Sequence, residues 1–296
     1  MKKVITITIA IISIALFWYF FIKPQDYQIR VVAKSIPGTI NQSLKAWNNS
    51  IENASIVQLE DLKHLKQTIK SEDSTHIYTW NISSINDSTS KLKVDVIDLN
   101  NSFKNKLSIP FTDTDFEKGS RKLVTEFMSY LNKHRKEFKV TMQPEEELPS
   151  TYCACVKHKT IQSKKAIAMK DSYPFLNSVL VGNGLKLNGV PFIEITDWNI
   201  DNDSLAFNFC YPILKTDSLP VIKDILYKEF KGAKSLKAIY NGNYITSDRA
   251  WYTLLDYAEK NKIKVDPKPV EFFYNNPNMG GDALYWKTEV FIPIAE

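Results

Sequence analysis

The hydrophobic and polar positions divide the chain into one continuous apolar run and two longer segments of mixed pattern. Residues 4–22 carry no charge and are almost entirely apolar. A helix rises about 1.5 Å per residue, so this run would span roughly 28 Å, close to the hydrocarbon core of a bilayer. Its far end, residues 17–21, is aromatic, as is typical where a helix meets the headgroups. The pattern predicts a transmembrane anchor over residues 1–25, with residues 4–22 in the bilayer.

A cleaved signal peptide is the alternative explanation of the same run. Its apolar region would be shorter and followed by small residues at a cleavage site, and residues 21–25 offer no such site. Lys2 and Lys3 precede the run, whereas Lys23, Asp26 and Arg30 follow it. The positive-inside rule then predicts a single-pass protein with a cytoplasmic N-terminus and an extracytoplasmic body.

Residues 26–142 form the first mixed segment. Strand patterns at 27–32, 76–80, 92–97 and 107–110 surround a helical stretch that includes Trp47. A longer helix begins at Thr114 or Asp115, and its apolar side is formed by Phe116, Leu123, Val124, Phe127, Leu131 and Phe138. This order is similar to the START-like (SRPBCC) helix-grip fold, and the resemblance implies a curved sheet around a long C-terminal helix.

The second mixed segment repeats one pattern. The polar residues 143–149, which include Pro144 and Pro149, predict a hinge and a domain boundary. Beyond the hinge, a strand, a helix and two strands follow in that order, and then the same order returns. The expected ranges are 152–160, 163–180, 189–195 and 205–212 in the first copy, and 235–241, 248–260, 269–275 and 284–292 in the second.

Four pieces of the second copy carry a family resemblance. They are residues 236–244, which include Gly242-Asn-Tyr244, the helix start at 248–251, and residues 270–277 and 287–294. In this order and spacing they resemble the GyrI-like effector-binding domain, which also forms the ligand-sensing half of many AraC- and MerR-type regulators. The resemblance implies two pseudo-symmetric βαββ units over residues 150–296. The expected fold class is therefore α+β: a transmembrane helix, a START-like domain and a GyrI-like domain.

The resemblance also implies a groove for hydrophobic, often cationic, ligands, with one glutamate on the last strand. That glutamate is Glu289. Strand alternation places Tyr285, Lys287, Glu289 and Phe291 on one face, and this face is expected to line the groove. A carboxylate among aromatic rings suits a delocalised cation, because charge pairing and cation–π attraction add together.

Further ligand-binding residues follow from the same resemblance. Tyr244 of the Gly-x-Tyr motif and Phe273 are expected at the pocket, while Trp251 is either pocket lining or core. Superposing Pro212 on Pro293 makes Asn208 the counterpart of Glu289, so the groove is expected to hold one carboxylate.

Charge and cysteine usage narrow the function further. The net charge of +5 comes from lysines scattered among acids, and no helix-turn-helix pattern precedes the repeat, so we expect no nucleic-acid partner. Cys153, Cys155 and Cys210 are too few for a disulfide scaffold and match no zinc spacing. Cys153 and Cys155 would point to the same face of a strand and are expected to be small core residues. We expect no metal and no cofactor.

Three functions remain open. The leading hypothesis is a membrane-anchored, non-enzymatic protein that binds a small hydrophobic or cationic ligand. The second is a hydrolase of electrophilic small molecules, with Glu289 orienting water and Tyr244 or Tyr285 as the acid. The replacement of a family tyrosine by Phe273 and the absence of a nucleophile triad pattern count against it. The third is a protein-interaction module with an unused pocket, whose partner is unknown.

Overall fold

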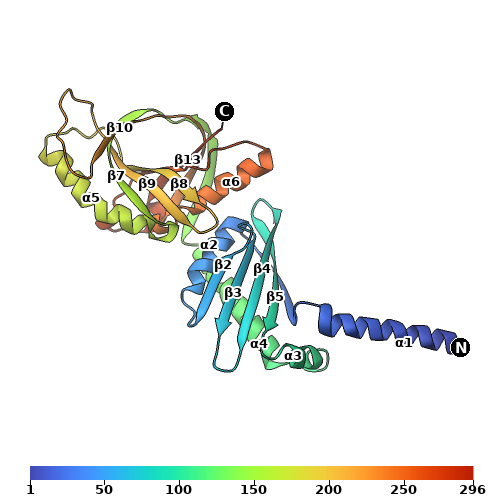
Figure 1. Ribbon diagram of the computed structural model, residues 1–296. Helices are drawn as coiled ribbons and strands as arrows, with labels where there is room; N and C mark the ends of the chain where they lie inside the picture. Colours follow the sequence, from blue (N-terminus) through green and yellow to red (C-terminus); the bar gives the residue numbers. More distant parts are fainter. Residues whose placement is uncertain (296) are drawn as a thin grey trace. The chain divides into compact units, whose positions relative to one another are not determined.

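The computed structural model describes residues 1–295, apart from the side chain of Lys2. The chain divides into two compact units, Met1–Lys133 and His134–Glu296. Each unit has its own antiparallel sheet with accompanying helices, so the predicted α+β class is confirmed (Figure 1). The assignment of the two units to START-like and GyrI-like domains stays a prediction.

The N-terminal apolar run is helical. Helix α1 (Lys2–Phe17) continues into a π-helical turn, η1 (Trp18–Ile22). Residues 3–22 are long and apolar enough to cross a membrane, and most of their apolar side chains are exposed in the structure. A signal sequence near an N-terminus has the same properties, so the anchor and its orientation stay predictions.

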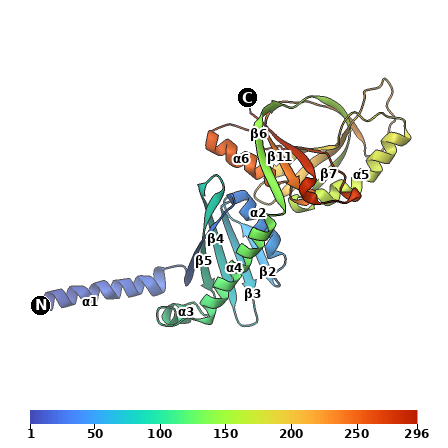
Figure 2. The ribbon, with the colours of Figure 1, turned by 180° about the vertical axis from the view of Figure 1, so that it is seen from behind.

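The first unit is a five-stranded sheet covered on one face by helices. Its strand order is β1-β5-β4-β3-β2, with bounds Tyr27–Ala33, Thr89–Asp98, Thr75–Asn86, His64–Lys70 and Ala54–Gln58. Helix α2 (Pro37–Asn48) and the long helix α4 (Asp115–His134) bring Leu44 and Phe127 onto buried strand residues such as Trp80 and Val94. Figure 2 shows α4 lying along the sheet.

The start of α4 follows from a capping box. The Glu117 backbone N–H donates to Thr114 Oγ1 at 3.2 Å, and the Thr114 N–H donates to the Glu117 carboxylate at 3.0 Å. This reciprocal pair satisfies backbone groups that the first turn leaves open. Phe138, expected on the apolar side of this helix, lies instead in the next strand.

One expectation for the first unit is wrong. Residues 107–110 are not a strand, because they complete helix α3 (Ser102–Ser108) and the turn after it. Phe103 and Leu107 are four residues apart, so the short apolar pattern fits a helical turn as well as a strand. Strands β2 and β3 were not predicted.

The second unit is an eight-stranded sheet with the order β10-β7-β9-β8-β12-β13-β11-β6. The first copy of the repeat is β7 (Thr151–Ile161), α5 (Lys165–Gly182), β8 (Phe192–Asn199) and β9 (Ser204–Pro212). The second copy is β11 (Lys234–Gly242), α6 (Arg249–Asn261), β12 (Val270–Phe273) and β13 (Lys287–Pro293). Helices α5 and α6 lie on the same side of the sheet (Figure 1). Both copies occur in the predicted order.

The predicted hinge at 143–149 is wrong over most of its length. Strand β6 (Phe138–Glu147) pairs with β11, and β10 (Leu226–Phe230), also unpredicted, pairs with β7. The register of β6 shifts between Gln143 and Glu146, where Pro144 lies. A proline is tolerated at such an irregularity of an outer strand, because no ladder hydrogen bond is needed there.

Candidate functional site: a cavity beside helix α5

A cavity of about 570 Å³ lies between α5 and the helix-covered face of the second sheet. Its walls come from α5, from the ends of β9 and β12, and from the loops around residues 190, 244 and 276. Large apolar and aromatic side chains in these walls include Ile167, Met169, Tyr173, Phe209, Tyr211, Tyr244, Phe273 and Trp286.

Strand alternation explains why aromatic side chains meet here. Phe209 and Tyr211 are two residues apart on β9, and they point to the same side of the sheet as Phe273 on β12. The loop after β12 is held by Tyr244, because the Asn275 N–H donates to the Tyr244 hydroxyl at 3.0 Å. The Tyr244 hydroxyl in turn is 3.0 Å from the Asn275 carbonyl oxygen, to which it donates.

Tyr244 is the centre of the aromatic wall. Its ring centroid lies 4.8 Å from that of Phe273 and 5.7 Å from that of Trp286. Burial raises the pKa of Tyr244 to about 12, against a smaller opposing effect of its hydrogen bond to Asn275. The phenol is therefore neutral near pH 7 and serves as a wall and a hydrogen-bonding group.

The cavity is almost without charge. Among the described lining residues, Lys170 is the one charged side chain, and none is a carboxylate, histidine, serine or cysteine. Polar groups are supplied by asparagines, namely Asn243, Asn275, Asn276 and Asn278. Apolar walls with a few amide groups suit an uncharged ligand that also accepts or donates hydrogen bonds.

The structure does not bring the seven predicted ligand-binding residues together. Tyr244 and Phe273 line the cavity, whereas Asn208, Glu289 and Phe291 lie on the opposite face of the sheet. Trp251, on α6, is completely buried and packs against Trp198 of β8, so it is a core residue. Tyr285 is 81% exposed. It does not belong to the last strand, because residues 283–285 form a helical turn capped by the Asp282 carboxylate.

Glu289 already has cationic partners. Its carboxylate lies 2.7 Å from Lys287 Nζ and 3.4 Å from Lys237 Nζ, and it accepts a hydrogen bond from Tyr274 at 2.9 Å. Burial alone would raise the pKa of Glu289, but these two lysines and the tyrosine outweigh burial and lower it. Tyr274 also lines the cavity, whereas Glu289 does not, so the Tyr274 side chain links Glu289 to the cavity.

The opposite sheet face carries a second carboxylate that the sequence analysis missed. Glu194 on β8 accepts a hydrogen bond from Asn208 Nδ2 at 2.8 Å and pairs with Lys228 Nζ at 2.6 Å. The expectation of a single carboxylate on this face is therefore wrong. Strand alternation could have revealed Glu194, because it is directly opposite Asn208 in the sheet.

A buried ionic cluster lies behind the cavity and was also missed. Lys165 Nζ is 2.6 Å from the Glu271 carboxylate and 2.6 Å from Ser247 Oγ, and it lies 4.7 Å from the Trp251 ring centroid. Ser247 Oγ donates to the other Glu271 oxygen at 2.7 Å. All four side chains are fully buried. The carboxylate and the aromatic ring form a site suited to a cation, and the Lys165 ammonium occupies it.

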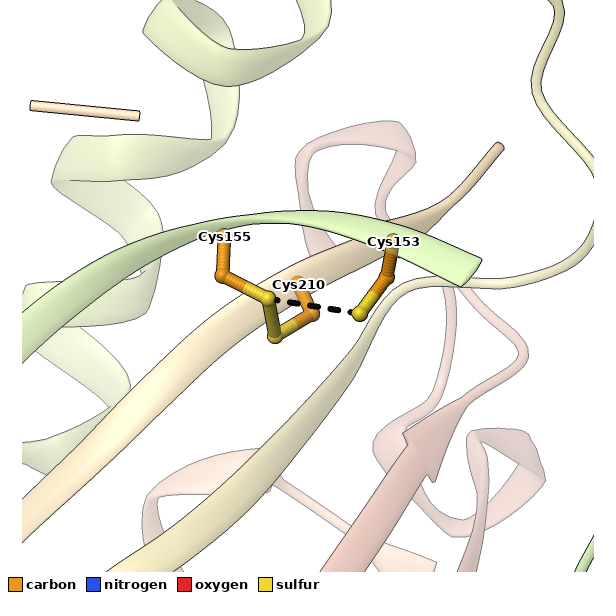
Figure 3. A group of neighbouring side chains, drawn as sticks. All are labelled: Cys153, Cys155 and Cys210. Atoms are coloured by element: carbon orange, nitrogen blue, oxygen red, sulfur yellow. Dashed lines mark hydrogen bonds between the residues drawn. A yellow bond between two sulfur atoms is a disulfide. The ribbon is translucent and has the colours of Figure 1, made fainter. Parts of the chain in front are cut away.

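The three cysteines gather on the face of the sheet opposite the helices (Figure 3). Cys155 and Cys210, which are directly opposite each other on β7 and β9, form a disulfide. Cys153 remains a thiol, 3.5 Å from Cys155 Sγ, and burial raises its pKa to about 12. The expectation that Cys155 is merely a small core residue is wrong, because it is cross-linked to Cys210. With two sulfurs joined, the cluster does not offer three thiolates to a metal.

Comparison with known proteins gives distant structural likeness only. No family model and no curated protein matches the chain. Among solved structures, the chain is similar to the C-terminal domain of EcmrR, at 18% identity and a TM-score of 0.44 over 54% of this chain and 98% of that chain. An EcmrR–DNA complex gives 17% identity and a TM-score of 0.45 over 65% and 70%. SAV2435 bound to tetraphenylphosphonium gives 12% identity and a TM-score of 0.36 over 52% and 94%.

Proposed function

We propose that the second unit binds a hydrophobic small molecule, without transforming it, in the cavity beside α5. The observation that carries the proposal is the cavity itself: about 570 Å³, with walls that include Tyr244, Phe273 and Trp286. Ligand pockets for small molecules have volumes of about 300–1,000 Å³ and predominantly apolar walls. The ligand that fits these walls is uncharged or weakly charged, because both nearby carboxylates, Glu271 and Glu289, already hold lysines.

Binding is favoured over hydrolysis because the side chains that could act as acid or base are unsuited to proton transfer near neutral pH. A hydrolase needs a positioned group that exchanges protons near neutral pH. The pKa of Tyr244 and that of Tyr274 are both raised to about 12, chiefly by burial. Tyr285, the other acid considered, points into solvent. Among the described lining residues there is no general base.

The same proposal includes the membrane anchor. Residues 3–22 have the length and composition of a membrane-crossing helix. The Cys155–Cys210 disulfide supports an extracytoplasmic body, because disulfides persist mainly in oxidising compartments. The absence of a nucleic-acid partner stays a prediction.

The test uses adjacent residues on opposite sheet faces. Phe273 lines the cavity, whereas Phe272 stacks on Phe192 on the other face. Binding of a neutral solvatochromic dye (Nile red) to the purified full chain would be titrated by fluorescence. Phe273→Leu removes one aromatic wall, worth about 0.5–1.5 kcal/mol, so affinity should fall about 2- to 12-fold. Phe272→Leu, the matched control, should bind as the wild type does.

Two other outcomes would redirect the proposal. Equal losses in the two variants would show that dye affinity follows the stability of the sheet, not the cavity. If instead a cationic dye (rhodamine 6G) binds tightly and Glu289→Gln alone weakens it, the ligand site lies on the opposite face, as the sequence predicts.

A further inference from the structure

Helix α3 has its polar side inside and its apolar side outside. Asn105 and Lys106 are buried, at 8% and 5% exposure, whereas Phe103 and Leu107 are 60% and 50% exposed. Phe111, in the turn that follows, is 83% exposed and continues the spacing of four residues. A helix on a soluble domain shows the reverse pattern, with its apolar stripe toward the core. We name Phe103, Leu107 and Phe111 the α3 patch.

The inverted orientation is held by specific bonds. Lys106 Nζ donates to the Lys23 carbonyl at 2.7 Å and lies 3.9 Å from the buried Asp26 carboxylate. Asn105 Nδ2 donates to Asp98 at 3.4 Å. A buried ammonium and a buried amide are stable only when paired in this way. The polar side is therefore fixed inward, and the α3 patch is fixed outward.

The α3 patch lies beside the end of the apolar N-terminal helix. The Tyr19 hydroxyl donates to the Lys106 carbonyl at 3.0 Å, and the Phe20 and Phe103 ring centroids are 5.4 Å apart. Trp18 and Phe21, on the same turn of helix, are 52% and 70% exposed. The patch thus continues the aromatic end of residues 3–22 as one apolar surface.

We propose that the α3 patch inserts into the outer headgroup region of the bilayer that α1 crosses. This inference rests on the membrane anchor of the proposed function and adds a second, interfacial contact to it. A short amphipathic helix with Phe and Leu on one face and a lysine such as Lys104 at its side is suited to the boundary of headgroups and acyl chains. The first unit is then seated on the membrane surface, and η1 leads directly into it without a free tether.

The experiment places a fluorescent label on the patch in the full-length protein. Phe111→Cys and, separately, Phe103→Cys are labelled with a bimane dye; the native cysteines are buried and two form a disulfide. The protein is reconstituted into nanodiscs of phosphatidylcholine and phosphatidylglycerol with or without nitroxide-labelled lipid. Ile85→Cys is the control, since Ile85 is 55% exposed in the β4–β5 hairpin, at the other end of these strands.

Nitroxide lipid should quench the labels at 111 and 103 at least about threefold more than the label at 85, since quenching falls steeply with distance. Nanodisc incorporation with equal, weak quenching at all three sites would leave the anchor standing and overturn the inference. Labels on the patch that are shielded from aqueous iodide yet not quenched by lipid would mean that a protein covers the patch, and would also overturn it. If the protein is recovered outside the nanodiscs after reconstitution, the anchor and the inference are both overturned.

Discussion

The two βαββ halves of the second unit share one topology but differ in how they are held together. With Pro212 superposed on Pro293, the opposed pair Cys155 and Cys210 takes the place of the opposed pair Lys237 and Phe291. The first half joins these strands covalently. The second half places the Lys237 ammonium 5.1 Å from the Phe291 ring centroid.

The helices of the two halves differ in how closely they pack on the sheet, and here the second half is the more tightly held. Helix α6 is tightly packed, with its buried residues Ala250, Trp251, Tyr252, Leu254 and Ala258 on the sheet. Helix α5 contains Pro174, borders the cavity and leaves Ile167, Phe175 and Val181 exposed. A cavity removes packing contacts from the side chains that line it. The comparison suggests that the half with the cross-linked strands is the half that accommodates an open space under its helix.

The largest effect is expected where the two halves are connected. Lys165 begins α5 of the first half, and Glu271 is on β12 of the second half. Lys165→Met leaves the fully buried Glu271 carboxylate without its cation, which should lower the free energy of unfolding by about 3–5 kcal/mol. Urea unfolding followed by circular dichroism measures this loss.

The control for this prediction removes both charges. Lys165→Met with Glu271→Leu replaces the pair by apolar side chains, and most of the lost stability should return. If the double variant is as unstable as the single one, the pair contributes through packing and hydrogen bonding to Ser247, not through charge.

A somewhat smaller effect is expected from the cross-link of the first half. Cys155 and Cys210 are separated by 55 positions, and loss of such a closed loop costs about 2–4 kcal/mol. The variant Cys155→Ala/Cys210→Ala should show this loss in thermal and urea unfolding. Cys153→Ala removes the neighbouring thiol but no bond, so it should cost distinctly less. Equal costs would mean that the cysteines act only as core side chains.

The smallest effect concerns acid stability of the first half. His158 stacks on Phe207 and bonds Ser172 of α5, and burial lowers its pKa below the ordinary 6.5, although Asp171 opposes this. Above pH 6.5, both the folded and the unfolded state keep this ring neutral. As the pH falls through 6.5, the unfolded state binds the proton first, so stability declines until the lower folded pKa is reached.

His158→Gln should therefore flatten the pH dependence of the unfolding free energy between about pH 7 and pH 5. Above about pH 7 any change in stability should be independent of pH. Melting curves at several pH values measure it. An unchanged slope would assign the acid sensitivity to other groups, such as His134, whose pKa is also lowered, chiefly by burial and then by Arg249.

The sequence predicts long periodic elements well and pairings across the fold poorly. The βαββ order and the inward face of α4 follow from apolar spacing. Strand β6 was misread because Pro144 and three glutamates suggest a linker, whereas an outer strand with an irregular register tolerates them.

The site was predictable to the same degree. The family resemblance locates two wall residues, Tyr244 and Phe273, and the alternation of β13 places Glu289 and Phe291 on one face. The partners of the charged groups were not predictable, because Lys165 and Glu271 are 106 positions apart and meet only through the packing of α5 on the sheet. The disulfide likewise depends on the register of β7 against β9. Whether Glu289 or Asn208 contacts a ligand stays a prediction.

Strand β6 has a practical consequence for dissecting the protein. Its residues 138–147 cover one side of β11 along almost the whole of that strand. A fragment that starts at residue 150 would leave the amide and carbonyl groups of β11 open to pairing with another chain, which is a common route to aggregation. A fragment that starts at residue 134 keeps β11 covered. Insolubility of the shorter fragment would then report the missing strand and not an inability of the second unit to fold.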